Sequence, residues 1–137
     1  MHNLPRTSAL FLLITATACM SVDQERDLMK GAIEQSQRLS SEIVNWRTMA
    51  PSNTQATEES IGAFQDRADE IVGTLNGVST QARKGTDVSG LVQALETLRD
   101  FDTDRYDSAS QTARDSLLDQ FAGLARNVQQ SASRIRA

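Results

Sequence analysis

The chain has 137 residues, with 18 acidic and 14 basic side chains and a formal net charge of −4. A chain of this length forms one small domain with a single hydrophobic core. Its negative charge argues against nucleic-acid binding, which requires a basic surface. The only histidine is His2 and the only cysteine is Cys19, so the sequence beyond Cys19 cannot supply a Ser-His-Asp or Cys-His catalytic site. We therefore do not expect an enzyme.

An uncharged apolar segment lies near the N-terminus, at residues 9–18 (ALFLLITATA), after the single cation Arg6. It is shorter than the ~20 apolar residues that a transmembrane helix needs. Charged residues follow at once, beginning with Asp23 and Glu25, and prevent its extension. A short apolar run that closes on small side chains is typical of a signal peptide, which we assign to residues 1–18.

The signal segment closes on residues 16–19 (ATAC), which resemble the cleavage box of bacterial lipoprotein signals. This sequence departs from the pattern at Ala16, where that family prefers leucine. The resemblance implies cleavage before Cys19 and acylation of its sulfur with fatty acids such as palmitate. It also implies a lipidated N-terminus at residues 19–22 and a mature domain at residues 23–137.

The residue after the cysteine is Met20. In enteric lipoproteins an aspartate at this position implies retention in the inner membrane, so Met20 implies the outer membrane, with the domain facing the periplasm. A plain secretory signal with a cysteine near its cleavage site is the alternative interpretation of Cys19. A disulfide would need a second cysteine, and a zinc or iron site would need several more ligands.

The first two helices are predicted from apolar positions that recur every three or four residues. Ser21 and Gln24 fit a capping box at the start of the first helix, which Pro51 ends. The second helix follows the sequence PSNT and is expected to continue across residues 76–77 (Asn-Gly) until Gly85 stops it. Its apolar positions are Ile61, Phe64, Ala68, Ile71, Leu75, Val78 and Ala82.

A third, shorter helix is predicted at residues 87–101 and a fourth at residues 104–136. No segment shows the alternation of a β-strand. The sequence therefore predicts an all-α fold, an antiparallel bundle of three long helices and one short helix with coiled-coil-like packing. Trp46 and Phe64 flank the Pro51 turn and are expected near one end of the core.

Alternate aspartates that could converge on calcium occur in one segment, as Asp100, Asp102 and Asp104. They match the start of an EF-hand loop, but the sixth position is Arg105 instead of glycine and the twelfth is Gln111 instead of glutamate. The favoured interpretation is a turn whose acids cap the next helix, with Ser108 and Gln111 as its capping box. We expect no metal and no cofactor.

These observations favour a lipid-anchored envelope protein that acts by protein–protein contact. A second copy of the chain is one candidate partner. Secretin pilotins are similar in architecture, being small helical lipoproteins of comparable size. The alternatives are a periplasmic module that binds a small ligand or calcium and, third, a hydrolase built on carboxylates. The contact face is expected on the second or fourth helix, whose small residues allow close approach of a partner helix: Gly73, Asn76, Gly77, Ala122 and Gly123.

Overall fold

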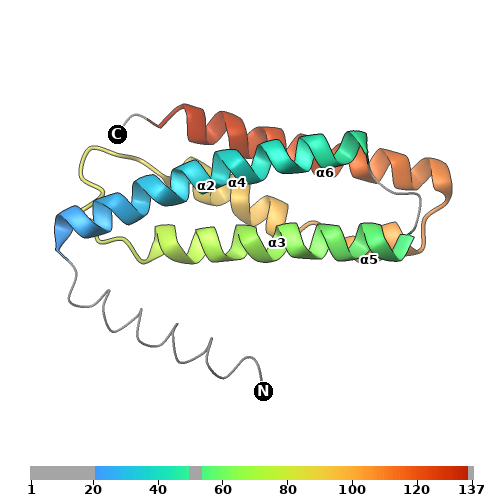
Figure 1. The fold of residues 1–137 in the computed structure, drawn as a ribbon, viewed down its shortest axis with the longest axis horizontal. Helices are drawn as coiled ribbons and strands as arrows, with labels where there is room; N and C mark the ends of the chain where they lie inside the picture. The colour runs from blue at the N-terminus through green and yellow to red at the C-terminus, as the bar shows by residue number, and fades with distance from the viewer. Residues whose placement is uncertain (1–20, 50–53, 136–137) are drawn as a thin grey trace, which may run out of the picture.

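The computed structural model describes residues 21–49 and 54–135. In these ranges the chain forms helices α2 (Val22–Thr48), α3 (Thr54–Asn76), α4 (Ser89–Arg99), α5 (Thr103–Asp107) and α6 (Gln111–Ser133) (Figure 1). About 80% of the described residues are helical and none of them lies in a strand, which confirms the predicted all-α fold. None of these helices is both long enough and apolar enough to cross a membrane.

Four of the helices pack side by side as a bundle (Figure 1). Helix α2 contacts α3 and α6, and α4 contacts the same two helices. The partners run in opposite directions: Glu42, late in α2, pairs with Arg67 of α3 at 2.9 Å, whereas Glu25, early in α2, reaches Ser79 beyond the end of α3. The predicted antiparallel bundle of three long helices and one short helix, α4, is therefore confirmed.

Different segments of the chain lie at the two ends of the bundle, which we call the proximal end and the distal end (Figure 1). The proximal end contains Ser21, residues 77–88 between α3 and α4, and the last turn of α6. The distal end contains Met49, α5 and the segments that flank α5. Helices α2, α3 and α6 run between these two ends, so side chains at the proximal end and the distal end lie far apart.

Helix α2 begins with the predicted capping box. The Ser21 hydroxyl accepts a hydrogen bond from the Gln24 N–H at 3.2 Å, and the Ser21 N–H donates to the Gln24 side-chain oxygen at 3.0 Å. These bonds satisfy backbone groups that the first turn of a helix leaves without partners. Helix α4 is shorter at both ends than the predicted segment.

Helix α3 ends at Asn76, so the expectation that it continues to Gly85 is wrong. The Gly77 N–H donates to carbonyls of the preceding turn, at 3.1 and 3.2 Å. The Glu25 carboxylate of α2 then accepts the Ser79 N–H at 2.8 Å, which withdraws that donor from a helix. Gly85 adopts a left-handed φ of 83° that a glycine tolerates without strain. Two apolar side chains of this turn segment stay buried, Val78 and Ala82.

The predicted fourth helix is two helices, α5 and α6, joined by a short turn. Ser108 is the C-cap of α5, and its N–H and its hydroxyl both donate to the Asp104 carbonyl, at 3.4 and 3.3 Å. Ser110 then caps α6 by accepting the Ala113 N–H at 3.3 Å. The predicted capping box of Ser108 and Gln111 is therefore wrong.

The core is built from the predicted apolar positions of the helices. Its largest fully buried apolar side chains are Met29, Leu39, Ile43, Ile61, Leu75, Leu91, Leu95, Leu98, Phe121 and Val128. Two serines of α2 are also buried, and both have partners. The Ser36 hydroxyl donates to the Ala32 carbonyl at 2.9 Å, and the Ser40 hydroxyl donates across to the Ala125 carbonyl of α6 at 2.5 Å. Small side chains let α2 and α6 approach closely but bury little area, so we expect modest stability.

Candidate functional site

The predicted lipidation residue, Cys19, and the residue after it, Met20, lie outside the described part of the chain. Helix α2 begins at Val22, three positions after Cys19. The folded domain therefore starts almost directly after the predicted cleavage site.

The three candidate calcium ligands lie at the end of α4 and the start of α5. Asp100 pairs with the neighbouring Arg99, whose Nε donates to Oδ1 at 2.9 Å, and this hydrogen bond lowers the pKa of Asp100. Asp102 caps α5 by accepting the Asp104 N–H at 2.9 Å. Within residues 21–49 and 54–135, no three His, Cys, Asp or Glu side chains are grouped closely enough to hold a metal ion.

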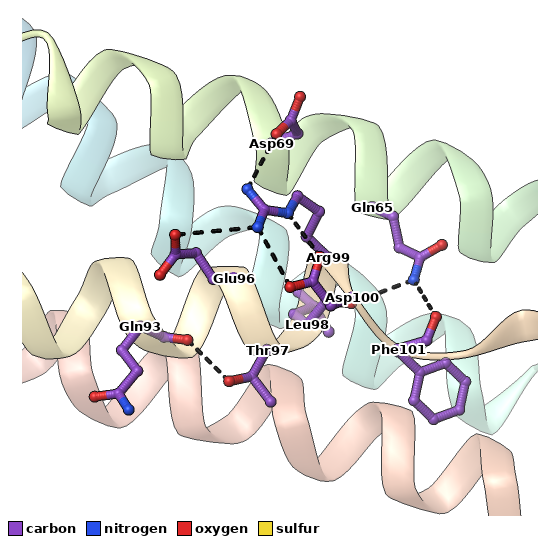
Figure 2. A network of polar contacts seen from close by, with 9 residues as sticks. All are labelled: Gln65, Asp69, Gln93, Glu96, Thr97, Leu98, Arg99, Asp100 and Phe101. Carbon is purple, nitrogen blue, oxygen red and sulfur yellow. Dashed lines mark hydrogen bonds and ion pairs between the residues drawn. The ribbon is translucent and has the colours of Figure 1, made fainter.

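A polar network joins the end of α4 to α3 (Figure 2). The Arg99 guanidinium donates to Asp69 of α3 at 3.3 Å as well as to Asp100. The Gln65 side-chain amide donates to the carbonyls of Leu98 and Phe101, at 3.3 and 2.8 Å. The Leu98 carbonyl lies in the last turn of α4, and the Phe101 carbonyl lies just beyond the helix. The network therefore fixes the position of α4, and its exposed ion pairs contribute only about 0–1 kcal/mol each.

A layer of four aromatic rings closes the distal part of the core. Phe121 of α6 is fully buried, and its ring centre lies 5.2 Å from that of Phe101, 6.4 Å from that of Phe64 and 6.4 Å from that of Trp46. Trp46 and Phe64 also meet edge to face at 5.5 Å. This contact confirms that the two residues that flank the α2–α3 turn lie at one end of the core. The layer joins α2, α3, α6 and the segment between α4 and α5.

Helix α5 crosses the distal end and is held to α6 by one arginine. Arg114 donates from Nε to the Tyr106 carbonyl at 3.1 Å and from Nη2 to the Asp107 carbonyl at 2.9 Å. Its guanidinium carbon also lies 5.5 Å from the centre of the Tyr106 ring. Tyr106 is only 4% exposed, so these contacts hold its ring in the core.

A pair of carboxyl groups lies where α5 meets the first turns of α3. The Glu58 side chain is partly exposed, but its Oε1 atom is shielded from solvent and has no hydrogen-bond partner among the described residues. The hydrogen bond to the Asp107 side chain raises the pKa of Glu58 above its ordinary value, and burial and the charge of Asp107 act in the same direction. Two carboxyl groups in such contact repel each other when both are ionised.

Sequence reasoning missed this pair. No spacing in the sequence links the two residues, because α5 brings Asp107 to Glu58 by folding across the distal end. The other acids of the distal end are mostly exposed: Glu59, Asp102, Asp104, Asp115 and Asp119.

The predicted contact residues are divided between the surface and the core. Gly73, Asn76 and Gly77 are exposed at the end of α3, and Gly123 is partly exposed on α6. Ala122 is only 1% exposed, so its assignment to a free contact face is wrong, because it packs inside the bundle. The described surface also carries shallow open grooves, one of about 370 Å³ between α2 and α3.

Comparison of the chain with protein-family models, with curated proteins and with solved structures finds no match. No residue of this chain therefore takes a role from a relative.

Proposed function

We propose that this chain is a lipid-anchored protein of the bacterial cell envelope that acts by protein–protein contact, in a structural, chaperone-like or pilotin-like role. The observation that carries the proposal is the position of Cys19. This residue closes a small-residue box after a short apolar run, and the capped helix α2 starts directly after it. An acyl group on Cys19 would thus hold a folded bundle close to the membrane, with no linker domain between them.

The anchor would also orient the bundle. Residue 19 lies three positions before Val22, which corresponds to at most about 11 Å of extended chain. The proximal end would therefore sit near the lipid surface. Helix α2 has 27 residues, and a rise of 1.5 Å per residue places the distal end about 40 Å away along the helix axis. The acid-rich distal end would be the part presented to a partner in the periplasm, because negatively charged headgroups repel carboxylates.

Contact, and not catalysis, fits the polar residues of the described surface. Arg99 and Gln65 hold the end of α4 against α3, and Asp102 caps a helix. Apolar side chains remain on the outside, where Leu28 is 39% exposed and Met49 is 77% exposed. Methionine is enriched in protein–protein interfaces.

The anchor is tested by labelling the full chain with palmitate in a bacterial host. The wild-type chain should take up label and fractionate with the outer membrane, whereas Cys19→Ser should take up none and accumulate unprocessed. Thr17→Ser, which keeps a small residue in the box, is the matched control and should label normally. Equal labelling of Cys19→Ser would refute the assignment.

A second substitution tests the address. In an enteric host Met20→Asp should move the labelled protein to the inner membrane, and Met20→Ser should leave it in the outer membrane. If both variants fractionate alike, Met20 does not set the location.

Crosslinking in intact cells tests the contact with a partner. The anchored chain should capture a protein partner, and the chain lacking the anchor should capture much less of it, since confinement to a surface raises the effective concentration.

A further inference from the structure

The segment that joins α3 to α4 at the proximal end, residues 77–88, carries two adjacent cations, Arg83 and Lys84 (Figure 1). A third cation, Arg26 of α2, donates from Nε to the Ala82 carbonyl at 3.3 Å and so lies against the same segment. Among the described residues, none of these three cations forms an ion pair with an acid, and the ion pairs there belong to other arginines. Their charges therefore remain available to an external anion.

These cations border an open hollow of about 480 Å³, which residues 80 and 83–89 line. Two hydroxyl groups of its lining, those of Thr80 and Thr86, have no hydrogen-bond partner within residues 21–49 and 54–135. The hollow lies beside the start of α4, where the N-cap Val88 provides no side-chain hydrogen bond and the Gly90 N–H has no acceptor in the same ranges. Cations, hydroxyls and the N–H groups at the start of a helix are the donors that bind phosphate in proteins.

Two acids lie near the hollow, and both already have donors of their own. Asp87 accepts the Ser89 hydroxyl at 2.6 Å and the Ser89 N–H at 3.0 Å, and these hydrogen bonds lower the pKa of Asp87. Glu25 of α2 accepts the Ser79 N–H at 2.8 Å and the Ser79 hydroxyl at 3.2 Å. Each acid is therefore engaged by the chain itself, whereas the charges of the cations are not.

We propose that this hollow is a phosphate-binding site, in which Arg83 and Lys84 pair with the anion and the hydroxyls of Thr80 and Thr86 donate to its oxygens. The site lies at the proximal end, which the proposed anchor at Cys19 places near the lipid surface. The phosphate of an anionic phospholipid headgroup is therefore the expected ligand, and this part of the inference rests on the proposed function. Free phosphate has the same chemistry, and the two arms of the test separate the two sources.

The first arm titrates the full chain in a nonionic detergent with inorganic phosphate, at constant ionic strength and with chloride as the reference anion. The backbone amide resonances of Gly85 and Gly90 should shift saturably with phosphate and should not shift with chloride. Arg83→Gln and Lys84→Gln should each weaken the binding of phosphate by about three- to fivefold, and the double variant should weaken it by about tenfold or more. The absence of any shift that is specific to phosphate would overturn the site.

Two further variants separate the site from the charge of the whole domain. The double variant Arg38→Gln and Arg105→Gln removes the same charge from exposed positions outside the hollow and should bind phosphate as the wild type does. Asp87→Asn keeps an acceptor for the Ser89 N–H and removes a repelling charge, so phosphate should bind about three- to fivefold more tightly. An equal loss of binding in the Arg38 and Arg105 control would overturn the site, and so would a weaker binding in Asp87→Asn.

The second arm identifies the source of the phosphate. The full chain is tethered through Cys19, its only cysteine, to a maleimide lipid in vesicles of phosphatidylglycerol or of digalactosyl diacylglycerol, whose headgroup has no phosphate. Hydrogen exchange of residues 79–89 should be slower on phosphatidylglycerol, and the double variant of Arg83 and Lys84 should abolish the difference. Phosphate binding in the first arm without this slowing would assign the site to free phosphate and overturn the headgroup as its ligand. The tether needs no acylation in cells, so a failure of palmitate labelling would leave both arms unchanged.

Discussion

Replacement of Phe121 by alanine should be among the most damaging single changes in this domain. The ring is fully buried and touches the rings of Trp46, Phe64 and Phe101, which come from three other parts of the bundle. Removal of a buried phenylalanine side chain costs about 3–5 kcal/mol, which includes the energy of the cavity it leaves. The loss of each aromatic ring pair accounts for about 0.5–1.5 kcal/mol of that cost.

This loss is large compared with the stability that the domain can have. The free energy of unfolding of domains of this size is about 5–15 kcal/mol. Because the alanines and serines between α2 and α6 bury little area, we expect a value near the lower end of this range. At about 4–8 °C per kcal/mol, Phe121→Ala should lower the unfolding midpoint by at least about 12 °C. Phe121→Leu keeps most of the volume and should cost about 1–2 kcal/mol.

The fluorescence of Trp46 provides the assay, because it is the only tryptophan in the chain and lies against Phe121. Thermal unfolding followed at the indole should show the large fall for Phe121→Ala and the smaller one for Phe121→Leu. Leu28→Ala, at a position that is 39% exposed, should change stability by less than about 0.5 kcal/mol. A midpoint for Phe121→Ala within about 3 °C of wild type would show that the four rings are not packed as described.

Three further outcomes are expected. A Cβ at Gly31 would meet no atom within 4 Å, so Gly31→Ala should raise the free energy of unfolding in urea by about 0.5–1 kcal/mol. Gly85 has a φ of 83°, so Gly85→Ala should lower the free energy of unfolding by about 1 kcal/mol. A change of the same sign in both variants would contradict the backbone conformations at these two glycines. Thermal melts with millimolar calcium and with chelator should coincide, because Asp100 is paired with Arg99; a shift of several degrees would reveal binding. Single alanine replacement of each acid from Asp100 to Asp107 should reduce crosslinking to the partner in cells only slightly. Replacement of Cys19, which would remove the proposed anchor, should reduce this crosslinking severely. An acid whose replacement abolished crosslinking in a folded, anchored chain would point to a ligand site instead.

Periodicity predicted which side chains are buried more successfully than where helices end. Val78 and Ala82 continue the spacing of α3 and are buried, yet they lie in a turn segment beyond Asn76. A turn whose apolar residues point into the same core keeps the same spacing, so the pattern cannot distinguish it from a helix. The contact that favours the turn is the bond from the Ser79 N–H to Glu25 of α2, which no local pattern encodes.

The same limit applies to the candidate site. The place of Trp46 and Phe64 at one end of the core was predictable, because both lie near the residues that join the first two helices. The role of Asp102 as a cap was predictable in kind, since acids before a helix favour its start. The pairing of Glu58 with Asp107 was not, because it depends on the break between α5 and α6 at Ser108. Local chemistry therefore predicted the start of α2, whereas the break between α5 and α6 and the contacts between distant helices required the structure.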